Sequence, residues 1–493
     1  MLPSWYLLVP VLLPVLSGLF VGLNKRFGDS SKRDPFTFAV LVLNLGALVP
    51  VLFAPEGLRL ELFRLSERLP VFFRLDDTGR FFAVVMALLW AVSGAYSFEY
   101  MEHAEHRRRY YSFYLISLGV LMGLCFAGSI ITYYMFYELM TLLTVPLVMH
   151  EMTKEAVAAG IKYLIYSVLG ASLALLGVFL LSPVLESFDF IAGGWLKAGA
   201  DGTALTAVFL MLVGFGTKAG MFPLHGWLPT AHPVAPAPAS AVLSGIITKA
   251  GVLGALRVVY FLAGADFLRG SWAHIAWMGL TLFTVFMGSM LAFKEDLLKK
   301  RLAWSSVSQV SYVLFGLSTL HPLGMVGALL HVAAHALIKN TLFMSAGAII
   351  HRTGKTRVSE LEGIGKQMPG VMWCFTIASV GLVGIPPCLG FVSKWYLAQG
   401  ALSMTELPGF LSWLAPAILL ISALLTAGYL LTVVIRGFFP GNNPDGSRKL
   451  YENREPGLVM LLPMVFAAAL SLFLGMFPNA LIQLFTSIAG TVM

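Results

Sequence analysis

Residues 216–233 read GTKAGMFPLHGWLPTAHP, and they interrupt a chain that is otherwise rich in hydrocarbon side chains. The stretch holds one lysine, two histidines and three prolines, whereas the sequence on both sides of it is nearly all apolar. Ionisable groups are costly in an apolar interior, and prolines interrupt helices. Their occurrence together predicts that this part of the chain has a functional role.

The overall composition indicates which solvent surrounds the chain. Of its 493 residues, 58% are hydrophobic and 12% are charged, whereas an average soluble protein is about 45–50% apolar and about 25% charged. Apolar runs of about 20 residues recur, which is the length that crosses the hydrocarbon core of a bilayer. These runs do not alternate between apolar and polar residues, so they indicate helices rather than barrel strands. The lipid bilayer is therefore the expected surroundings.

The apolar runs predict an all-α polytopic membrane protein with about 14 transmembrane helices. We place these spans near residues 4–24, 35–54, 79–98, 111–128, 130–149, 157–182, 203–222, 237–262, 272–293, 302–318, 323–350, 371–396, 412–438 and 457–478. The chain 1–493 is expected to form a single integral membrane domain. Its predicted parts are the N-terminal three spans (1–110), a first repeat (111–262), a second repeat (271–438) and a C-terminal span (439–493).

Two of the predicted helices are broken close to a lysine. The prolines at these breaks are Pro223 and Pro229 in the seventh span, and Pro386 and Pro387 in the twelfth span. Lys218 precedes the first break and Lys394 follows the second. Irregular backbone at membrane depth is tolerated only where it is buried or lines a water-filled cavity. Paired breaks at corresponding places indicate an inverted repeat, which we assign to spans four to eight and nine to thirteen.

The basic residues of the loops predict the orientation in the membrane. Odd-numbered loops hold basic clusters such as Arg107, Arg108 and Arg109, whereas most even-numbered loops hold one basic residue or none. The loop after the second span differs, because its arginines alternate with acids, and we expect a mixed-charge surface segment there. The positive-inside rule then predicts a cell inner membrane protein with both termini on the non-cytoplasmic side. This distribution accounts for the net charge of +8, so we expect no nucleic-acid partner.

Several ionisable residues remain inside the predicted spans. These are Glu138, Lys218, Lys249, His331, His335, Lys339 and Lys394, with Lys162, His225 and His232 as weaker candidates. A charged side chain at the centre of a spanning helix costs roughly 2.5–3.5 kcal/mol on insertion scales. Such residues commonly mark ion pathways, and we predict that this set translocates protons.

Structural alternatives stay open for some of these residues. A long side chain near a helix end can extend its charge to the lipid headgroups, an alternative that applies to Lys162, Lys339 and Lys394. Glu138 and Lys218 can instead form a static ion pair. Arg257 and His274 lie near the ends of their spans, and we expect them to face the membrane–water interface.

The histidines of HVAAHALIK suit proton relay. His331, His335 and Lys339 are spaced by four residues, so they lie on one helix face about 6 Å apart. Two histidines one turn apart can be half of a zinc site, but no HExxH glutamate and no third ligand lie nearby in the sequence. Histidine titrates near neutral pH, so we prefer relay to metal binding and expect no metal and no cofactor. Two core histidines bonded to neighbouring carbonyls remain an alternative.

Four stretches resemble one family of membrane subunits. Residues 218–258, beginning KAGMFPLHGWLP, resemble the signature of the proton-conducting antiporter-like subunits of respiratory complex I, Mrp-type cation/proton antiporters and energy-converting membrane hydrogenases. KEDLLKKRLAWSSVSQVSYVLFGLS (294–318) and HALIKNTLFMSAGAIIHRTG (335–354) are similar to its second-repeat signatures, and GIPPCLGFVSKWYL (384–397) to its broken twelfth helix. The chain stops soon after the last span, so it resembles the middle-sized subunits.

The resemblance implies roles for the matching residues. It implies an ion pair between Glu138 and Lys218, a central lysine at Lys249, a relay on the helix of His331, His335 and Lys339, and a terminal residue at Lys394. Some members have glutamate at that last position, and the lysine excludes a close match to their branch.

The resemblance also implies a function and partners. It implies a subunit that moves H⁺ within a redox-driven complex, either complex I-like or of the energy-converting hydrogenase type. FYELMTLLTVPLVMH (136–150) is closer to this branch than to Mrp subunits. Expected partners are other membrane subunits, including further antiporter-like ones, and peripheral redox subunits with iron–sulfur clusters. Two alternatives are a subunit of an Mrp-type Na⁺/H⁺ antiporter, with Na⁺ as an ion, and a non-conducting membrane scaffold.

Overall fold

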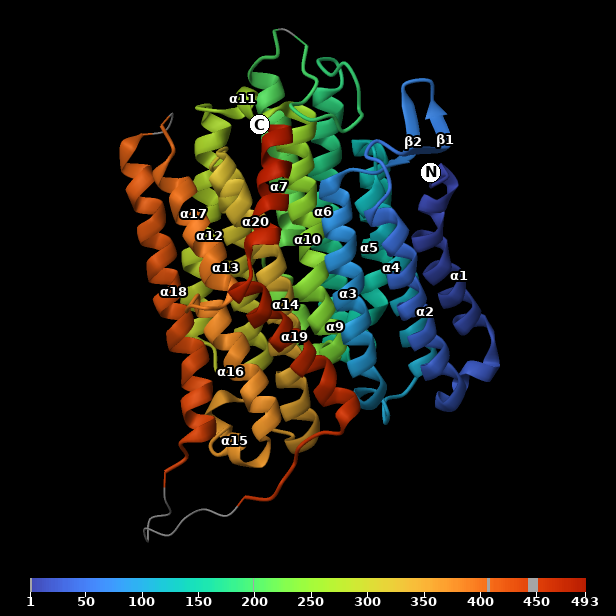
Figure 1. The fold of residues 1–493 in the computed structure, drawn as a ribbon, viewed down its shortest axis with the longest axis vertical. Helices are drawn as coiled ribbons and strands as arrows, with labels where there is room; N and C mark the ends of the chain where they lie inside the picture. The colour runs from blue at the N-terminus through green and yellow to red at the C-terminus, as the bar shows by residue number, and fades with distance from the viewer. Residues whose placement is uncertain (1, 198, 406–407, 442–450) are drawn as a thin grey trace.

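Long helices running side by side dominate the fold (Figure 1). The computed structural model describes residues 2–197, 199–405, 408–441 and 451–493. Within these ranges, 12 helices are long and apolar enough to cross a membrane. The prediction of a polytopic helical membrane protein is therefore confirmed.

The first part of the chain contains a strand pair beside its helices. Its elements are η1 (Ser4–Leu8), α1 (Val9–Leu23), η2 (Lys25–Gly28), α2 (Ser30–Leu52), β1 (Arg59–Ser66), β2 (Leu69–Arg74) and α3 (Asp77–Tyr100). The strands pair antiparallel, from Arg59 opposite Arg74 to Ser66 opposite Leu69. The segment expected as a mixed-charge surface segment is thus a β-hairpin, and its first strand is largely exposed. Charged and apolar residues alternate in it with the period of a strand.

The middle of the chain forms the first group of packed helices. Its elements are α4 (Arg107–Phe126), α5 (Ile130–Val148), α6 (Lys154–Leu181), α7 (Gly202–Ala219), α8 (Leu228–Val234), α9 (Ala237–Val242), η3 (Leu243–Ile247), α10 (Thr248–Arg257) and η4 (Val258–Ala263). Residues 237–263 make one continuous apolar stretch whose span is completely buried. The segments η3 and η4 within it are π-helical, a geometry that often marks functional sites.

The rest of the chain forms a second group of helices and the C-terminal elements. These are α11 (Ala265–Leu268), α12 (Trp272–Lys294), α13 (Leu298–Ser318), α14 (Pro322–Thr353), η5 (Val358–Glu360), α15 (Ile364–Gln367), α16 (Pro369–Val383), α17 (Leu389–Leu402), α18 (Gly409–Phe438), α19 (Leu458–Met476) and α20 (Asn479–Val492). The sequence did not predict α20 as a separate helix. Part of the predicted C-terminal region, residues 442–450, lies outside the described ranges.

The predicted count of about 14 spans is not confirmed as such. Two predicted spans are missing from the 12 helices that satisfy both length and hydropathy. One is α13, which is long enough but rich in serine. The other is divided between the shorter helices α16 and α17. The boundaries of the two repeats remain a prediction.

Helix starts are fixed by local capping bonds. Asp76 Oδ1 accepts a hydrogen bond from the backbone N–H of Gly79 at 2.7 Å before α3, and Ser129 Oγ accepts one from Thr132 N at 3.1 Å before α5. The first N–H groups of a helix have no partner inside it, and such side chains supply one. The short gap between α4 and α5 is therefore a true helix boundary.

Both predicted helix breaks occur at glycines in the left-handed region. Helix α7 ends at Ala219, followed by Gly220 with φ of 80°, and α16 ends at Val383, followed by Gly384 with φ of 90°. Glycine adopts this backbone without a Cβ clash. Pro223 lies in the first break, and Pro386 and Pro387 in the second, whereas Pro229 lies in the first turn of α8. Pro229 therefore begins a helix.

Helix α14 lies deep within the bundle. It packs against α3, α9, α13, α16, α17 and α19, and all of its residues from 324 to 349 are buried. Lys339 is 0% exposed. The alternative in which Lys339 extends to the lipid headgroups is therefore wrong.

Arg257 and His274 do not face the membrane interface, because each is only 1% exposed. The guanidinium of Arg257 donates to both carboxylate oxygens of Asp76, at 2.5 and 2.8 Å. His274 Nε2 lies 2.7 Å from the backbone oxygen of Ser318. The sequence-based expectation was wrong because nearness to a helix end does not reveal which neighbouring helices cover a side chain.

Candidate functional site

Lys218 lies in the last turn of α7 and is completely buried. Its ammonium donates to Thr141 Oγ1 and, at 3.4 Å, to the hydroxyl of Tyr163. The rings of Tyr137 and Tyr163 lie 4.8 and 5.3 Å from Lys218 Nζ. Ring faces and hydroxyl oxygens both attract a cation, so neutral groups hold this lysine in place.

Glu138 does not form the expected ion pair with Lys218. No ion pair among the described residues joins them, and the buried oxygen Oε1 of Glu138 has no hydrogen-bond partner. Thr141, nearly one turn after Glu138 on α5, takes the ammonium instead. The carboxylate and the ammonium still lie within electrostatic reach of one another. The static ion-pair alternative is thus not supported by this structure.

Lys249 and His335 are in direct contact in the buried interior. Lys249 Nζ lies 2.5 Å from His335 Nδ1, and it donates to the backbone oxygen of Ser244 at 2.9 Å. The residues come from α10 and α14, and their exposures are 1% and 0%. An ammonium and an imidazole nitrogen at this distance can exchange a proton along one hydrogen bond.

His331 continues the same face of α14. Its ring centroid lies 6.2 Å from that of His335. Nδ1 lies 2.9 Å from Ser393 Oγ on α17, and Nε2 lies 3.2 Å from Gln309 Oε1 on α13. The two histidines therefore bond to side chains, His335 to Lys249, and His331 to Ser393 and the amide carbonyl of Gln309. The alternative of core histidines bonded to carbonyls does not describe His335 and fits one bond of His331. Among the described residues, no three His, Cys, Asp or Glu side chains are arranged to hold a metal.

Lys339 is bound by α13. Its ammonium donates to Ser305 Oγ at 2.7 Å and to the backbone oxygen of Leu302 at 3.0 Å. Ser305 Oγ also accepts a hydrogen bond of 2.8 Å from the hydroxyl of Tyr429 on α18. Three helices therefore meet at this lysine.

Lys394 occupies the second helix break. Its ammonium donates to the backbone oxygens of Leu382 and Val383 at 2.7 and 3.0 Å, and it lies 5.1 Å from the centroid of the Tyr312 ring. Carbonyls at the end of a helix lack partners within it. Lys394 satisfies two of them, so it turns inward to the break and not outward to the headgroups.

The three weaker candidates lie around the first break. Lys162 Nζ donates to Thr230 Oγ1 at 2.9 Å, joining α6 to α8. His225 Nδ1 has no hydrogen-bond partner among the described residues. His232 is 0% exposed and stacks on Phe343 at 4.6 Å, and neither of its ring nitrogens has a partner in the described chain. His232 therefore does not satisfy a freed carbonyl.

Sequence reasoning missed the neutral side chains between the charged ones. They are Thr141, Tyr163, Ser305, Gln309, Ser393 and Tyr429. A signal was available in WSSVSQVSY (304–312), which places many hydroxyls in a helix of a membrane protein. The hydrogen bonds of the described residues join Lys249 to His335 on α14, Lys339 to α13, and His331 to α13 and α17. They do not join Lys218 to Lys249.

Comparison with known proteins assigns this arrangement to a family. Residues 127–426 match the family described as NADH:quinone oxidoreductase/Mrp antiporter, TM. NADH-quinone oxidoreductase subunit N of Desulforudis audaxviator is 30% identical over 452 residues, covering 91% of this chain and 88% of that protein. Hydrogenase-4 component B of Escherichia coli is 31% identical over 419 residues, 82% of this chain and 62% of that protein. An Na⁺/H⁺ antiporter subunit of Bacillus subtilis is 26% identical over 474 residues, 96% of this chain and 94% of that protein.

Solved structures share the fold along the whole chain. A chain of the Mrp complex from Dietzia sp. DQ12-45-1b superposes with a TM-score of 0.86 at 23% identity, covering 100% of this chain and 98% of that one. A chain of respiratory complex I from Thermus thermophilus superposes with a TM-score of 0.83 at 21% identity, covering 99% and 100%. The sequence matches and the shared fold together establish that the chain belongs to the NADH:quinone oxidoreductase/Mrp antiporter family of transmembrane subunits.

Proposed function

We propose that this chain moves protons across the membrane as an antiporter-like subunit of a redox-driven complex, either complex I-like or of the energy-converting hydrogenase type. The observation that supports this most directly is the 2.5 Å contact between Lys249 Nζ and His335 Nδ1 inside the protein. Two groups that both bind protons and that touch in the buried interior can pass a proton between them.

The first step of the proposed pathway involves Lys218 and Glu138. Burial disfavours the charged form of a lysine, and a nearby carboxylate favours it. Lys218 now binds Thr141, while Glu138 Oε1 is buried without a partner. If the ammonium moved toward Glu138, Lys218 would keep its proton. If it moved away from Glu138, Lys218 would release the proton.

The later steps use the face of α14. A proton on Lys249 has His335 as its neighbour, and His331 follows one turn away. His331 bonds to Ser393, the residue before Lys394, and Lys394 lies at the second helix break. Lys339 lies one turn beyond His335 on the same helix and donates to Ser305 of α13. Irregular backbone at such breaks lines cavities that water can enter, which would connect the pathway to each side of the membrane.

The partners follow from the family. We infer that the chain assembles with other membrane subunits, since its relatives include subunits of NADH-quinone oxidoreductase and of an Na⁺/H⁺ antiporter. We further propose peripheral redox subunits with iron–sulfur clusters, and a cell inner membrane location with both termini on the non-cytoplasmic side, as the loop charges predict.

An Mrp-type Na⁺/H⁺ antiporter subunit is the second candidate. The similarity to the Na⁺/H⁺ antiporter subunit of Bacillus subtilis over 96% of the chain supports it. We prefer the redox branch because the match to the NADH-quinone oxidoreductase subunit of Desulforudis audaxviator has the higher identity, 30% against 26%.

Purification of the intact complex distinguishes these functions. The redox proposal expects iron–sulfur subunits to co-purify, and electron transfer to acidify or alkalinise the lumen of reconstituted vesicles in Na⁺-free buffer. Co-purification of small membrane subunits alone, with proton movement that requires a Na⁺ gradient, would establish the Mrp function. If replacing Lys218 and Lys249 left proton movement unaffected, the chain would act as a non-conducting membrane scaffold.

A further inference from the structure

Tyr429 connects the buried relay to a network of loop residues. It lies on α18 and is 1% exposed. Its hydroxyl lies 2.8 Å from Ser305 Oγ and 3.3 Å from Thr426 Oγ1. Its backbone oxygen accepts a 2.8 Å hydrogen bond from Arg301 Nη1. Arg301 and Ser305 are four residues apart on α13, so they lie on one face and hold opposite ends of the same tyrosine.

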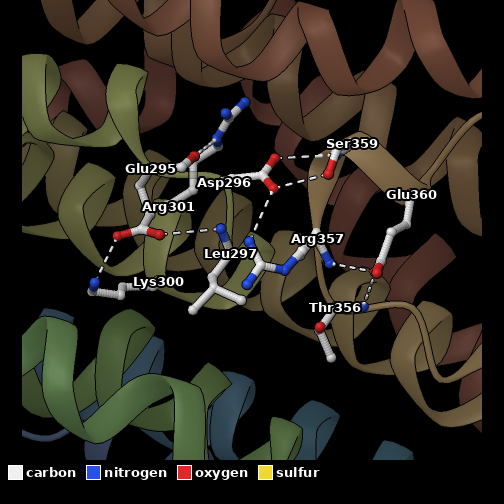
Figure 2. A network of polar contacts seen from close by, with 9 residues as sticks. All are labelled: Glu295, Asp296, Leu297, Lys300, Arg301, Thr356, Arg357, Ser359 and Glu360. Atoms are coloured by element: carbon white, nitrogen blue, oxygen red, sulfur yellow. Dashed lines mark hydrogen bonds and ion pairs between the residues drawn. The ribbon is translucent and has the colours of Figure 1, made fainter.

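Arg301 belongs to the loop network drawn in Figure 2, whose members are Glu295, Asp296, Leu297, Lys300, Arg301, Thr356, Arg357, Ser359 and Glu360. Asp296 accepts bonds from the backbone N–H and the hydroxyl of Ser359, at 3.1 and 2.9 Å, and its carboxylate lies 3.6 Å from Arg357 Nη1. Arg301 Nε donates to the backbone oxygen of Glu295 at 2.6 Å. The network thus ties the loop before α13 to the loop after α14.

Ser305 is the point at which this connection reaches the relay. Its oxygen accepts from Lys339 at 2.7 Å and from Tyr429 at 2.8 Å. A hydroxyl has two lone pairs and one proton. With one lone pair taken by Tyr429, Ser305 can accept from a charged lysine with the other, or donate its proton to a neutral lysine.

The bonds of Tyr429 also extend toward His331. Thr426 Oγ1 lies 3.5 Å from Gln309 Nε2, and Gln309 Oε1 lies 3.2 Å from His331 Nε2. The side chains on α13 and α18 that make these hydrogen bonds are all buried. Tyr429 therefore stands between the partners of Lys339 and those of His331.

We propose that Tyr429 is a positioning residue of the proton pathway: it fixes Ser305 for both protonation states of Lys339 and transmits the position of the loop network through Arg301. This inference rests on the proposed function. The other titratable groups within electrostatic reach of Lys339 are Lys249 on α10, His335 on α14 and His232 on α8. They are unchanged when the hydroxyl of Tyr429 is removed.

The test is Tyr429→Phe in the reconstituted complex, with Tyr260→Phe as the matched control. Tyr260 is also fully buried and donates to a backbone oxygen, that of Leu317, at 2.7 Å. Each change deletes one buried hydroxyl. We expect Tyr429→Phe to slow proton movement roughly three- to tenfold, the effect of losing one ordered hydrogen bond, and to change the pH profile of the rate. Tyr260→Phe is expected to keep the rate and the pH profile of the wild type.

A double-mutant cycle shows whether Tyr429 acts through Ser305. Ser305→Ala alone is expected to slow proton movement as Tyr429→Phe does, and the two changes together are expected to cost no more than one. Additive losses, or a Tyr429→Phe rate and pH profile equal to those of Tyr260→Phe, would overturn the inference. If Tyr429→Phe prevented assembly, the rate and pH profile of Ser305→Ala would decide it by themselves. Lys249→Met distinguishes a failure of this inference from a failure of the proposed function. If Lys249→Met abolishes pumping while Tyr429→Phe has no effect, only the inference about Tyr429 fails. If Lys249→Met has no effect on pumping, the proposed function fails.

Discussion

Lys249 on α10 and His335 on α14 share a buried contact of 2.5 Å between Nζ and Nδ1. When Lys249 is charged, all its ammonium hydrogens are donors, so Nδ1 must accept and a neutral His335 carries its proton on Nε2. Nε2 is buried without a partner among the described residues, and such a group commonly binds an internal water. While Lys249 is charged, the contact thus fixes this tautomer of His335.

Replacing Lys249 by methionine should abolish proton movement. The change keeps the length of the side chain but removes the group that binds a proton. We expect a loss of roughly 10²-fold or more, typical of removing a positioned acid or base. The rate of lumenal pH change in vesicles holding the reconstituted complex measures it. Lys366→Met, at an exposed position on α15, is the control and should pump as the wild type does.

Lys218→Arg tests whether deprotonation is required. Arginine keeps the positive charge but does not lose its proton in proteins. We expect the complex to assemble and its proton movement to fall by a factor similar to that for Lys249→Met. Undiminished pumping in this variant would contradict a role for neutral Lys218, and the same vesicle assay gives the answer.

Glu138→Gln should separate function from stability. Because Glu138 makes no ion pair with Lys218 among the described contacts, its charge contributes little to the fold. We expect a change in unfolding free energy below about 1 kcal/mol, together with a clear loss of proton movement. Thermal unfolding in detergent and the vesicle assay measure the two quantities. A large loss of stability would indicate a structural carboxylate instead.

Gly384→Ala should disturb the second helix break. The backbone there has φ of 90°, and an added Cβ would lie 2.9 Å from the Cδ atom of Lys394. We expect a loss of about 1 kcal/mol or more from the strained backbone, with slower proton movement as Lys394 shifts. Gly279→Ala, in the middle of α12 with nothing within 4 Å of an added Cβ, should instead be neutral or slightly stabilising.

Asp76→Asn should destabilise the protein because it leaves the charge of Arg257 buried without a counter-ion. Asp76 and Arg257 are 14% and 1% exposed, and breaking such a pair typically costs about 3–5 kcal/mol. Asp266→Asn is the matched control, since the carboxylate of Asp266 is 94% exposed in its pair with Arg269. The free energy of unfolding of Asp266→Asn should fall by less than about 1 kcal/mol. Denaturation of the purified protein measures both.

The same pair predicts a dependence of stability on pH. Burial raises the pKa of Asp76 and is the largest single effect. The charge and hydrogen bonds of Arg257, with the N–H of Gly79 and the charge of Arg74, together outweigh it, so the pKa lies below the ordinary value of 3.8. A carboxyl with a lowered pKa stabilises the folded state above its unfolded pKa, and this contribution is lost as the pH falls through the folded pKa. We expect the melting temperature of the wild type to decrease when the pH is lowered below about 4. Asp76→Asn should show less of this fall.

The sequence predicted much of the fold because its signals are local. The apolar runs gave the spans, and the prolines near Lys218 and Lys394 indicated the breaks that the structure places at Gly220 and Gly384. The sequence does not predict the hairpin of residues 59–74, because its alternating charges are also typical of a polar surface segment. The burial of Arg257 was missed as well, because it depends on Asp76, a residue 181 positions away.

Sequence alone determined that the chain crosses a membrane many times, where two helices break, and that His331, His335 and Lys339 share one face, because hydropathy, proline and helical spacing act within a few residues. The tertiary structure decided which groups touch. Lys218 binds Thr141 across 77 residues and not Glu138, and Tyr429 binds Ser305 across 124 residues. Hydrogen bonds extend about 3 Å, so only the packing of distant helices selects the partner of each buried charge.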